Sequence, residues 1–328
     1  MSAQGSPVIV NPDVYLNYLS ADVASTYELN RNISLVTLGA LIWDMLSSIP
    51  DDYRLIRTGR LSVVLFAYFL ARPTVLVMVI LAVLQKTGPV SNCTLVAMMT
   101  VTFQVISSAA ASFLFLKRIH AVYHGSKIVR HIFSLLWVIG VGTSCAVFSS
   151  TLHDYREIAN TKHCVRQSGW SALSIAFMDP VLFDTFVYFA IVYKVLSTHQ
   201  MGQKKDWRIF CCGNGLPHFS RAVFQGGQQY YLITTGANVM RFVFSADPSA
   251  SPTLQVLLST PAVALTSVMA CRVHRNLLIQ DLEEACIGNR ELARPVLANG
   301  RMVNVSLPSQ AKSDVTDQHE GAEICNKV

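Results

Sequence analysis

The chain has 328 residues, of which 52% are hydrophobic and only 14% are charged. Soluble domains carry about 25% charged residues, so this deficit excludes an ordinary soluble composition and favours several segments buried in lipid. The formal net charge of +6 does not indicate a nucleic-acid-binding protein, because the basic residues lie between the apolar segments, where they report membrane topology.

Seven apolar segments follow one another along the chain. A helix needs about 20 predominantly apolar residues to cross the roughly 30 Å hydrocarbon core of a bilayer, and each segment is of this order. We therefore expect an all-α integral membrane protein with a seven-transmembrane helix bundle over residues 30–274. The predicted spans are 30–49, 61–85, 95–116, 132–151, 170–197, 222–244 and 254–271.

The segments outside the bundle are more polar. Residues 1–29 contain no Lys or Arg and no long apolar run, so we expect an extracellular N-terminal tail rather than a cleaved signal peptide. In 275–286, apolar residues recur at helical spacing, which predicts an amphipathic helix on the inner leaflet. Residues 287–328 are rich in Asn, Ser, Gly and Pro and predict a disordered cytoplasmic tail.

The distribution of Lys and Arg predicts the orientation of the bundle. With the N-terminus outside, 19 of these residues fall on the inner side and five on the outer side, while two lie inside spans. The inner residues are three in 50–60, four in 117–130, five in 194–221 and seven from 272 onwards. Because cytoplasmic segments carry an excess of basic residues, we expect an outer N-terminus and a cytoplasmic C-terminus.

The cysteines give a second, independent indication of topology. Of the eight, Cys93 and Cys164 fall at outer positions, one at the mouth of the third span and the other in the loop between the fourth and fifth spans. Outward-facing cysteines meet oxidising conditions, which predicts a disulfide between them. The alternative is a pair of unpaired thiols.

Charged side chains inside the predicted spans are the most informative polar feature, because an ionisable group at the bilayer centre costs a few kcal/mol unless it is paired. Arg72 and Asp184 lie near the middle of their spans, Asp44 lies nearer the inner end of the first, and Arg241 lies in the sixth. One hypothesis is a polar pocket or switch built on Arg72, Asp184 and Asp44. The alternative is a static pair that only maintains helix packing.

The sequence does not support a retinal protein, a histidine-rich metal enzyme or a serine hydrolase. Span 254–271 contains no Lys for a retinal Schiff base, the nine His residues are scattered, and no G-x-S-x-G elbow is present. We therefore predict no catalytic residue, cofactor or metal, and do not expect an enzyme.

Three cysteines lie where the chain leaves the predicted spans on the inner side. Cys211, Cys212 and Cys286 are juxtamembrane, where S-acylation of cysteine occurs. Buried or free thiols are the alternative.

Several segments together resemble a family of uncharacterised basidiomycete fungal seven-helix membrane proteins with an N-terminal domain of unknown function. The likeness spans roughly residues 30–280. It implies a membrane location and seven helices, and it implies no substrate or catalytic residue. The segments that carry it include ALIWDMLSSIPDDYRLI, LFAYFLARP, SFLFLKRIHAVYHGSK, DPVLFDTFVYFAIVYK, LPHFSRAVFQGGQQYYLITTGANV and ACRVHRNLL.

From this layout we expect a receptor-like sensor in the plasma membrane. A small ligand of unknown identity would bind in the outer half of the bundle, beneath the loop that carries Cys164, and a cytoplasmic signalling protein would contact the basic inner segments. The lipid bilayer is the one other partner expected, and nucleic acid is not. The alternative is a small-solute or lipid transporter that uses a midplane pair of Arg72 and Asp184.

Overall fold

The structure is a computed structural model of the chain. It describes residues 15–57, 62–151, 155–158, 162–166, 173–199, 218–247, 251–292, 297–298 and 301–302.

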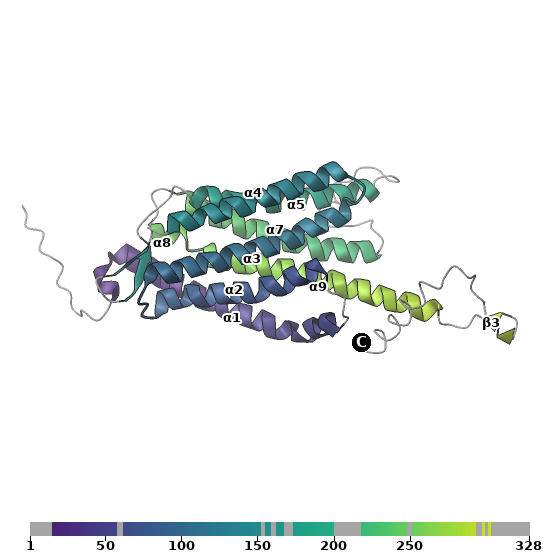
Figure 1. Cartoon of the computed structure of the whole chain (residues 1–328), viewed down its shortest axis with the longest axis horizontal. Helices are drawn as coiled ribbons and strands as arrows, with labels where there is room; N and C mark the ends of the chain where they lie inside the picture. The colour runs from purple at the N-terminus through teal and green to yellow at the C-terminus, as the bar shows by residue number, and fades with distance from the viewer. Residues whose placement is uncertain are drawn as a thin grey trace, which may run out of the picture. The chain divides into compact units, whose positions relative to one another are not determined.

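Most of the described residues are helical (Figure 1). Within the described part of the chain, seven helices are 25 residues long or longer, and each overlaps one of the predicted spans. A short helix η1 (Tyr15–Tyr18) precedes them, and α8 (Pro252–Gln255) lies before the last one. The seven are α1 (Ala21–Arg57), α2 (Val63–Thr87), α3 (Cys93–Val122), α4 (Lys127–Thr151), α5 (Leu173–His199), α7 (His218–Ala246) and α9 (Ser259–Leu292).

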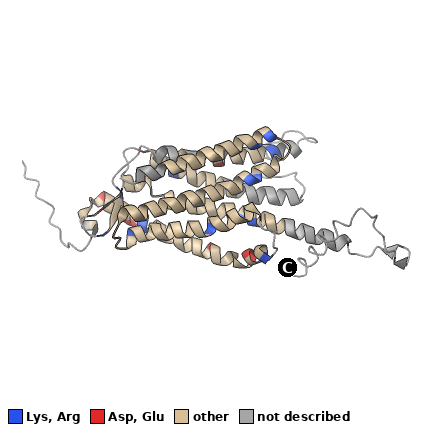
Figure 2. Ribbon diagram, in the orientation of Figure 1, with Lys and Arg blue, Asp and Glu red and all other residues tan. Residues whose placement is uncertain are grey.

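The helices have the length and composition of a membrane protein. Within the described residues, five stretches are long and apolar enough to cross a bilayer: α1, α2, α3, Lys127–Ala146 of α4, and Pro252–Gln280, which includes most of α9. Large apolar side chains such as Trp43 and Ile128 lie exposed on the helix surfaces. Charged residues gather towards the helix ends (Figure 2). Apolar surfaces of this kind suit contact with lipid, so these helices indicate a membrane protein, in line with the prediction.

The chain divides into two compact units. The first comprises Met1–Met45 and Ser62–Val273, and the second comprises Leu46–Leu61 and His274–Val328. In the second unit, Nε of Arg275 lies 3.4 Å from Oδ2 of Asp51. The candidate functional residues described below all belong to the first unit.

Helix α3 holds a central place in the first unit. It packs against α2, α4 and α5, while α5 also packs against α7. The small residues Ala110 and Ala111 are buried in α3, and they let the neighbouring helices approach closely. In lipid, close van der Waals packing of this kind holds helices together, because lipid tails are as apolar as the side chains.

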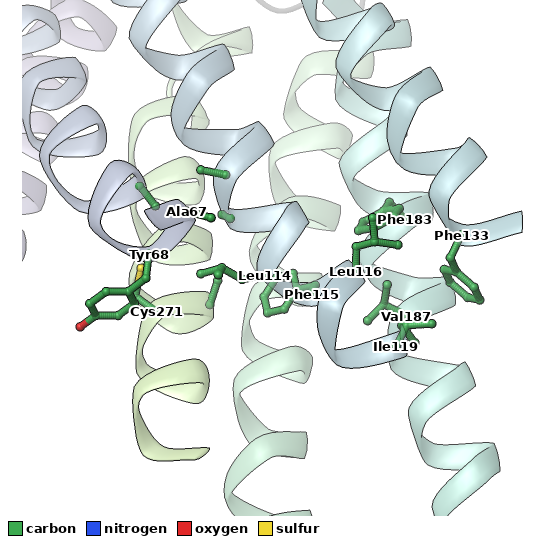
Figure 3. Close-up of a cluster of buried hydrophobic side chains, with 14 of the residues drawn as sticks. Ala67, Tyr68, Leu114, Phe115, Leu116, Ile119, Phe133, Phe183, Val187 and Cys271 are labelled. Atoms are coloured by element: carbon green, nitrogen blue, oxygen red, sulfur yellow. The ribbon is translucent and has the colours of Figure 1, made fainter. Parts of the chain in front are cut away.

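The main core cluster of the first unit joins five helices (Figure 3). Tyr68 of α2 and Cys271 of α9 lie beside Leu114 of α3, and Phe183 of α5 and Phe133 of α4 complete the other side. A second cluster on α1, α2 and α9 contains Leu41, Val75, Met78, Val79, Val263 and Ala264.

Helix α1 is longer than predicted at both ends. Residues 21–29, expected to be part of a tail, form its first turns, and the helix continues through Pro50, where we predicted its end. Proline removes one helical hydrogen bond, to the carbonyl of Leu46, without necessarily ending the helix. The boundary between the two units falls just before Leu46, the residue whose carbonyl loses this hydrogen bond.

Helix α9 also differs from the prediction. Residues 275–286, expected to form a separate surface helix, continue α9 without a break. The stretch 262–287 contains neither Gly nor Pro, so nothing in it interrupts the helix. Residues 287–292 of the predicted tail also belong to α9, and β3 (Leu297–Ala298) pairs with β4 (Arg301–Met302). The other residues of the predicted tail lie outside the described part of the chain.

Candidate functional site

One end of the first unit carries a disulfide-linked hairpin, and we call it the disulfide end. Strand β1 (Tyr155–Glu157) pairs antiparallel with β2 (Cys164–Arg166). Cys164 forms a disulfide with Cys93 at the start of α3, with 5.6 Å between the Cα atoms. This separation lies within the usual range for a disulfide. The predicted bridge between these two cysteines is confirmed, and it ties the hairpin to α3.

Helices α1 and α2 are joined to the same end by polar contacts. Nζ of Lys86 lies 2.8 Å from Oδ1 of Asn30 and 2.6 Å from Oγ of Ser34. The hydroxyl of the buried Tyr27 lies 3.3 Å from the carbonyl oxygen of Cys164 and 3.4 Å from that of Lys86. A tyrosine hydroxyl has one proton to donate, so these two carbonyls share it. The contacts connect three segments that are distant in the sequence.

An ionic cluster joins α1, α2 and α9 towards the opposite end of the first unit; Asp44 and Arg72 are buried in it, whereas Arg272 is partly exposed. Oδ2 of Asp44 lies 3.7 Å from a terminal nitrogen of Arg72, and Nε of Arg272 donates to Oδ1 of Asp44 at 2.7 Å. Arg72 also donates to the hydroxyl of the fully buried Tyr68 at 3.0 Å. We call Asp44, Tyr68, Arg72 and Arg272 the Asp44 cluster. The carboxylate of Asp44 is therefore the shared counter-ion of the guanidinium groups of Arg72 and Arg272, so a change in any one of these side chains affects the other two.

A second buried polar group joins α5, α7 and α9. Nδ2 of Asn238 donates to Oδ2 of Asp184 at 2.8 Å and lies 3.4 Å from Oγ1 of Thr266. Arg241, one helical turn beyond Asn238, attracts Asp184 electrostatically. Asp184, Asn238 and Arg241 are 2%, 3% and 5% exposed, so all three are excluded from solvent. We call Asp184, Asn238, Arg241 and Thr266 the Asp184 cluster.

The Asp184 cluster forms part of the wall of a cavity of about 60 Å³ between α3, α4, α5, α7 and α9. A buried water needs about 10–15 Å³ of such volume, so the cavity has room for several waters or a small ligand. Hydroxyl groups of Ser108, Ser112 and Ser144 add to its polar lining. Trp137 also lines it, and its indole N–H lies 3.1 Å from Oγ of Ser112 and 3.3 Å from the carbonyl of Ala109.

Helix α9 separates the cavity from the Asp44 cluster. Its residues Val263 and Thr266 line the cavity, whereas Arg272 binds Asp44. Arg272 follows Val263 by nine positions, which at 3.6 residues per turn places the two side chains on opposite sides of the helix. Because the helix rises 1.5 Å per residue, Arg272 lies about 9 Å further along α9 than Thr266. A rotation or shift of α9 would therefore change the cavity wall and the Asp44 cluster at the same time.

The four charged residues singled out in the sequence are all buried in the first unit. The structure brings Asp44 to Arg72 and Asp184 to Arg241, so they belong to two clusters. Sequence reasoning missed Arg272, because we ended the last span at Cys271. It also gave no role to Asn238, although Asn238 and Arg241 stand at i and i+3, the spacing that puts two side chains on one helix face.

The remaining predictions concern cysteines and metals. Cys211 and Cys212 lie outside the described residues, as does the side chain of Cys286. Among the described residues, Cys145 is exposed and Cys271 is buried, and neither forms a disulfide. The same residues contain no group of three or more His, Cys, Asp or Glu side chains arranged to hold a metal ion.

Comparison with known proteins gives no family assignment: no protein-family model matches the chain, and no curated protein matches it. The resemblance to the basidiomycete seven-helix family therefore stays a prediction from the sequence segments quoted above.

Proposed function

We propose that this protein is a receptor-like sensor of the plasma membrane, with seven membrane crossings, an extracellular N-terminus and a cytoplasmic C-terminus. The seven long helices of the described residues support the crossing number. The excess of Lys and Arg in the segments assigned to the cytoplasm supports the orientation. The bridge between Cys93 and Cys164 supports it too, since disulfides persist where conditions are oxidising.

The observation that carries this proposal is the cavity inside the bundle, whose mainly apolar wall includes the buried side chains of Asp184, Asn238 and Arg241. Charged groups within a membrane span are costly, and they commonly mark a ligand or ion site. Asp184, Asn238 and Arg241 line the cavity together, beside hydroxyl groups from α3 and α4. In this proposal a small ligand enters from the disulfide end, which faces the outside, and binds at these groups.

Helix α9 is the element that would carry the signal. A ligand that contacts Thr266 and Val263 changes the packing of one side of α9, and the opposite side of the helix holds Arg272 on Asp44. The ligand can shift the equilibrium between two positions of α9 only by its difference in affinity for them. Loosening the Asp44 cluster would alter the cytoplasmic end of the bundle, where a signalling protein would bind.

A ligand screen with the purified full-length protein in lipid nanodiscs tests the sensor function. Small polar compounds are tested for an increase in melting temperature, because a ligand that binds the folded state stabilises it. For a compound that binds, Asp44→Asn should change its affinity although Asp44 is not in the cavity lining, whereas Glu28→Gln, at an exposed ion pair, should not. The screen contradicts the proposal if no compound binds, or if Asp44→Asn leaves every affinity unchanged.

Two further measurements test the topology and the transporter hypothesis. Protease accessibility of tags at the two termini of the protein in cells should place the N-terminal tag outside and the C-terminal tag inside. A binding compound should not accumulate in liposomes that contain the protein. Accumulation there, lost with Asp184→Asn, would favour a transporter instead.

A further inference from the structure

We infer that the ends of α3 and α4 opposite the disulfide end bind the headgroup of an anionic phospholipid. This inference goes beyond the proposed function, because it involves neither the cavity nor the Asp44 cluster. The site is a group of basic side chains that we call the basic cluster. Its members are Lys117 and His120 of α3 and Lys127, Arg130 and His131 of α4.

The basic cluster is assembled around the ring of His120. Nε2 of His120 lies 3.3 Å from the carbonyl oxygen of Arg130 and 3.1 Å from Oγ of Ser134, so it joins the end of α3 to the start of α4. Lys117, Arg130 and His131 lie near enough to repel a positive charge on this ring. Lys and Arg gather at this end of the helices (Figure 2). Two helices thus bring charges of one sign together.

The described residues supply no acidic partner for these charges. Residues 53–153 contain no Asp or Glu, so α2, α3 and α4 contribute none. Among the described residues, Lys117, Lys127 and Arg130 form no ion pair, and the buried Nε of Arg130 has no hydrogen-bond partner. Like charges one helical turn apart, such as Lys127 and His131, destabilise a helix. An anion from outside the chain would relieve this repulsion.

The position of Lys117 favours an anion that belongs to the membrane. Its Nζ lies 5.1 Å from the ring centroid of Phe113, which is one helical turn further from the end of α3. The ring attracts the ammonium group but does not neutralise its charge. A charge within a membrane span is costly unless it is paired. A lipid phosphate lies at the boundary between headgroups and acyl chains, so it can reach an ammonium group below the helix end more easily than a cytoplasmic protein can.

The exposed face of α4 supplies a surface for the acyl chains. Ile128, Ile132 and Leu135 are each more than half exposed, and their spacing of three and four residues puts them on one face of the helix. Lys127 and His131 are also exposed, and each directly precedes one of the two isoleucines. A lipid whose chains lie along this face therefore has its headgroup beside the basic cluster.

The sign of the cluster selects the headgroup. Every phospholipid carries a phosphate, but in phosphatidylcholine a quaternary ammonium group accompanies it and would be repelled by the basic side chains. A headgroup with a net negative charge avoids this repulsion. In the proposed orientation this end faces the cytoplasm, and the cytoplasmic leaflet is the one that carries anionic lipids. Only this last point depends on the proposed orientation.

Native mass spectrometry of the purified full-length protein in a neutral detergent tests the inference. The probes are phosphatidylserine and phosphatidylcholine with the same acyl chains, and glycerol 3-phosphate, a phosphate without acyl chains. Phosphatidylserine should bind at least about tenfold more tightly than phosphatidylcholine. Glycerol 3-phosphate should not bind at concentrations that saturate the protein with phosphatidylserine, because the apolar face of α4 contributes nothing to its affinity.

Variants locate the site. Lys127→Gln, at an exposed residue, should weaken phosphatidylserine binding about fivefold, which corresponds to about 1 kcal/mol for one basic residue near a membrane surface. Arg31→Gln makes the same change of charge in α1, away from the cluster, and should have no effect. The triple variant Lys117→Gln, Lys127→Gln, Arg130→Gln should lose about 100-fold. The double variant Lys117→Arg, Lys127→Arg keeps the charges and should keep the affinity.

Cross-linking gives a second location. A phosphatidylserine with a photoactivatable group in its acyl chain should label the exposed face of α4 between 128 and 135, and Lys127→Gln should reduce this labelling. Labelling confined to other helices would overturn the inference.

The remaining outcomes are equally decisive. Equal binding of the two lipids, binding of glycerol 3-phosphate as tight as that of phosphatidylserine, or an unchanged affinity in Lys127→Gln would each overturn the lipid site. If the triple variant does not fold, Lys127→Gln and the cross-linking decide. Binding in detergent depends neither on the orientation of the protein nor on a ligand in the cavity. The lipid site can therefore fail while the sensor function stands, and the reverse.

Discussion

Asp44 and Arg272 are separated by 228 positions in the sequence, yet Nε of Arg272 lies 2.7 Å from Oδ1 of Asp44. This bond joins the first long helix to the last, and the same carboxylate faces Arg72 of α2. Three helices are thus held by one buried acid. Its removal leaves two guanidinium groups together without their common counter-ion, and this is the basis of the first prediction.

Asp44→Asn should destabilise the protein strongly, by about 3–5 kcal/mol, because it leaves an uncompensated buried charge. The measurement is the thermal unfolding of the purified protein. The control is Glu28→Gln, which removes an exposed ion pair with Arg31 at 3.9 Å and should cost less than about 1 kcal/mol. Equal melting temperatures for Asp44→Asn and the wild type would show that the Asp44 cluster contributes nothing to stability.

Loss of the disulfide should also lower stability. The bridge closes a loop of 71 residues, which in the chain-entropy description is worth up to about 4 kcal/mol. Cys93→Ser, Cys164→Ser and treatment of the wild type with a reducing agent should each lower the melting temperature by a similar amount. Cys145→Ser, at an exposed free thiol, is the matched control and should have little effect.

The hydroxyl of Tyr27 should contribute a smaller amount. Tyr27→Phe removes a donor shared by the carbonyls of Cys164 and Lys86, and a hydrogen bond of this kind is worth about 1 kcal/mol. The hairpin should then open more easily, which hydrogen–deuterium exchange at Val165 would detect. Tyr53→Phe changes a tyrosine that is 62% exposed and serves as the control. Unchanged exchange in the Tyr27 variant would exclude this hydroxyl as a support of the hairpin.

The hairpin should also respond to pH through His163. Burial lowers the pKa of His163 below its ordinary value of 6.5. The unfolded hairpin therefore binds a proton more readily than the folded one, so this residue favours folding above about pH 6.5 and the contribution is lost as the pH falls below it. Melting temperatures at pH 7.5 and 5 should differ more for the wild type than for His163→Gln. An identical difference in both proteins would rule out this role.

Several features of the fold could be predicted because they depend on composition and local pattern. Long runs without charge must bury their backbone polar groups in helices within a bilayer, so the positions of the long helices follow from hydropathy. The bridge between Cys93 and Cys164 also followed from the sequence, since those were the two cysteines expected at outer positions. The ends of the helices were less predictable. Helix α1 continues through Pro50, and α9 continues through 275–286. Neither a single proline nor a change to an amphipathic pattern is by itself enough to end a helix.

The partners of the buried charges required the tertiary structure. Sequence position indicated that Arg72 and Asp184 share a similar depth, but depth does not specify which way a side chain points around its helix. The structure places Arg72 with Asp44 and Arg272, and Asp184 with Asn238. Hydropathy along the chain therefore determines that there are membrane helices and roughly where they lie. The rotation and packing of each helix, which only contacts between distant segments decide, determine which polar groups meet and where a cavity forms.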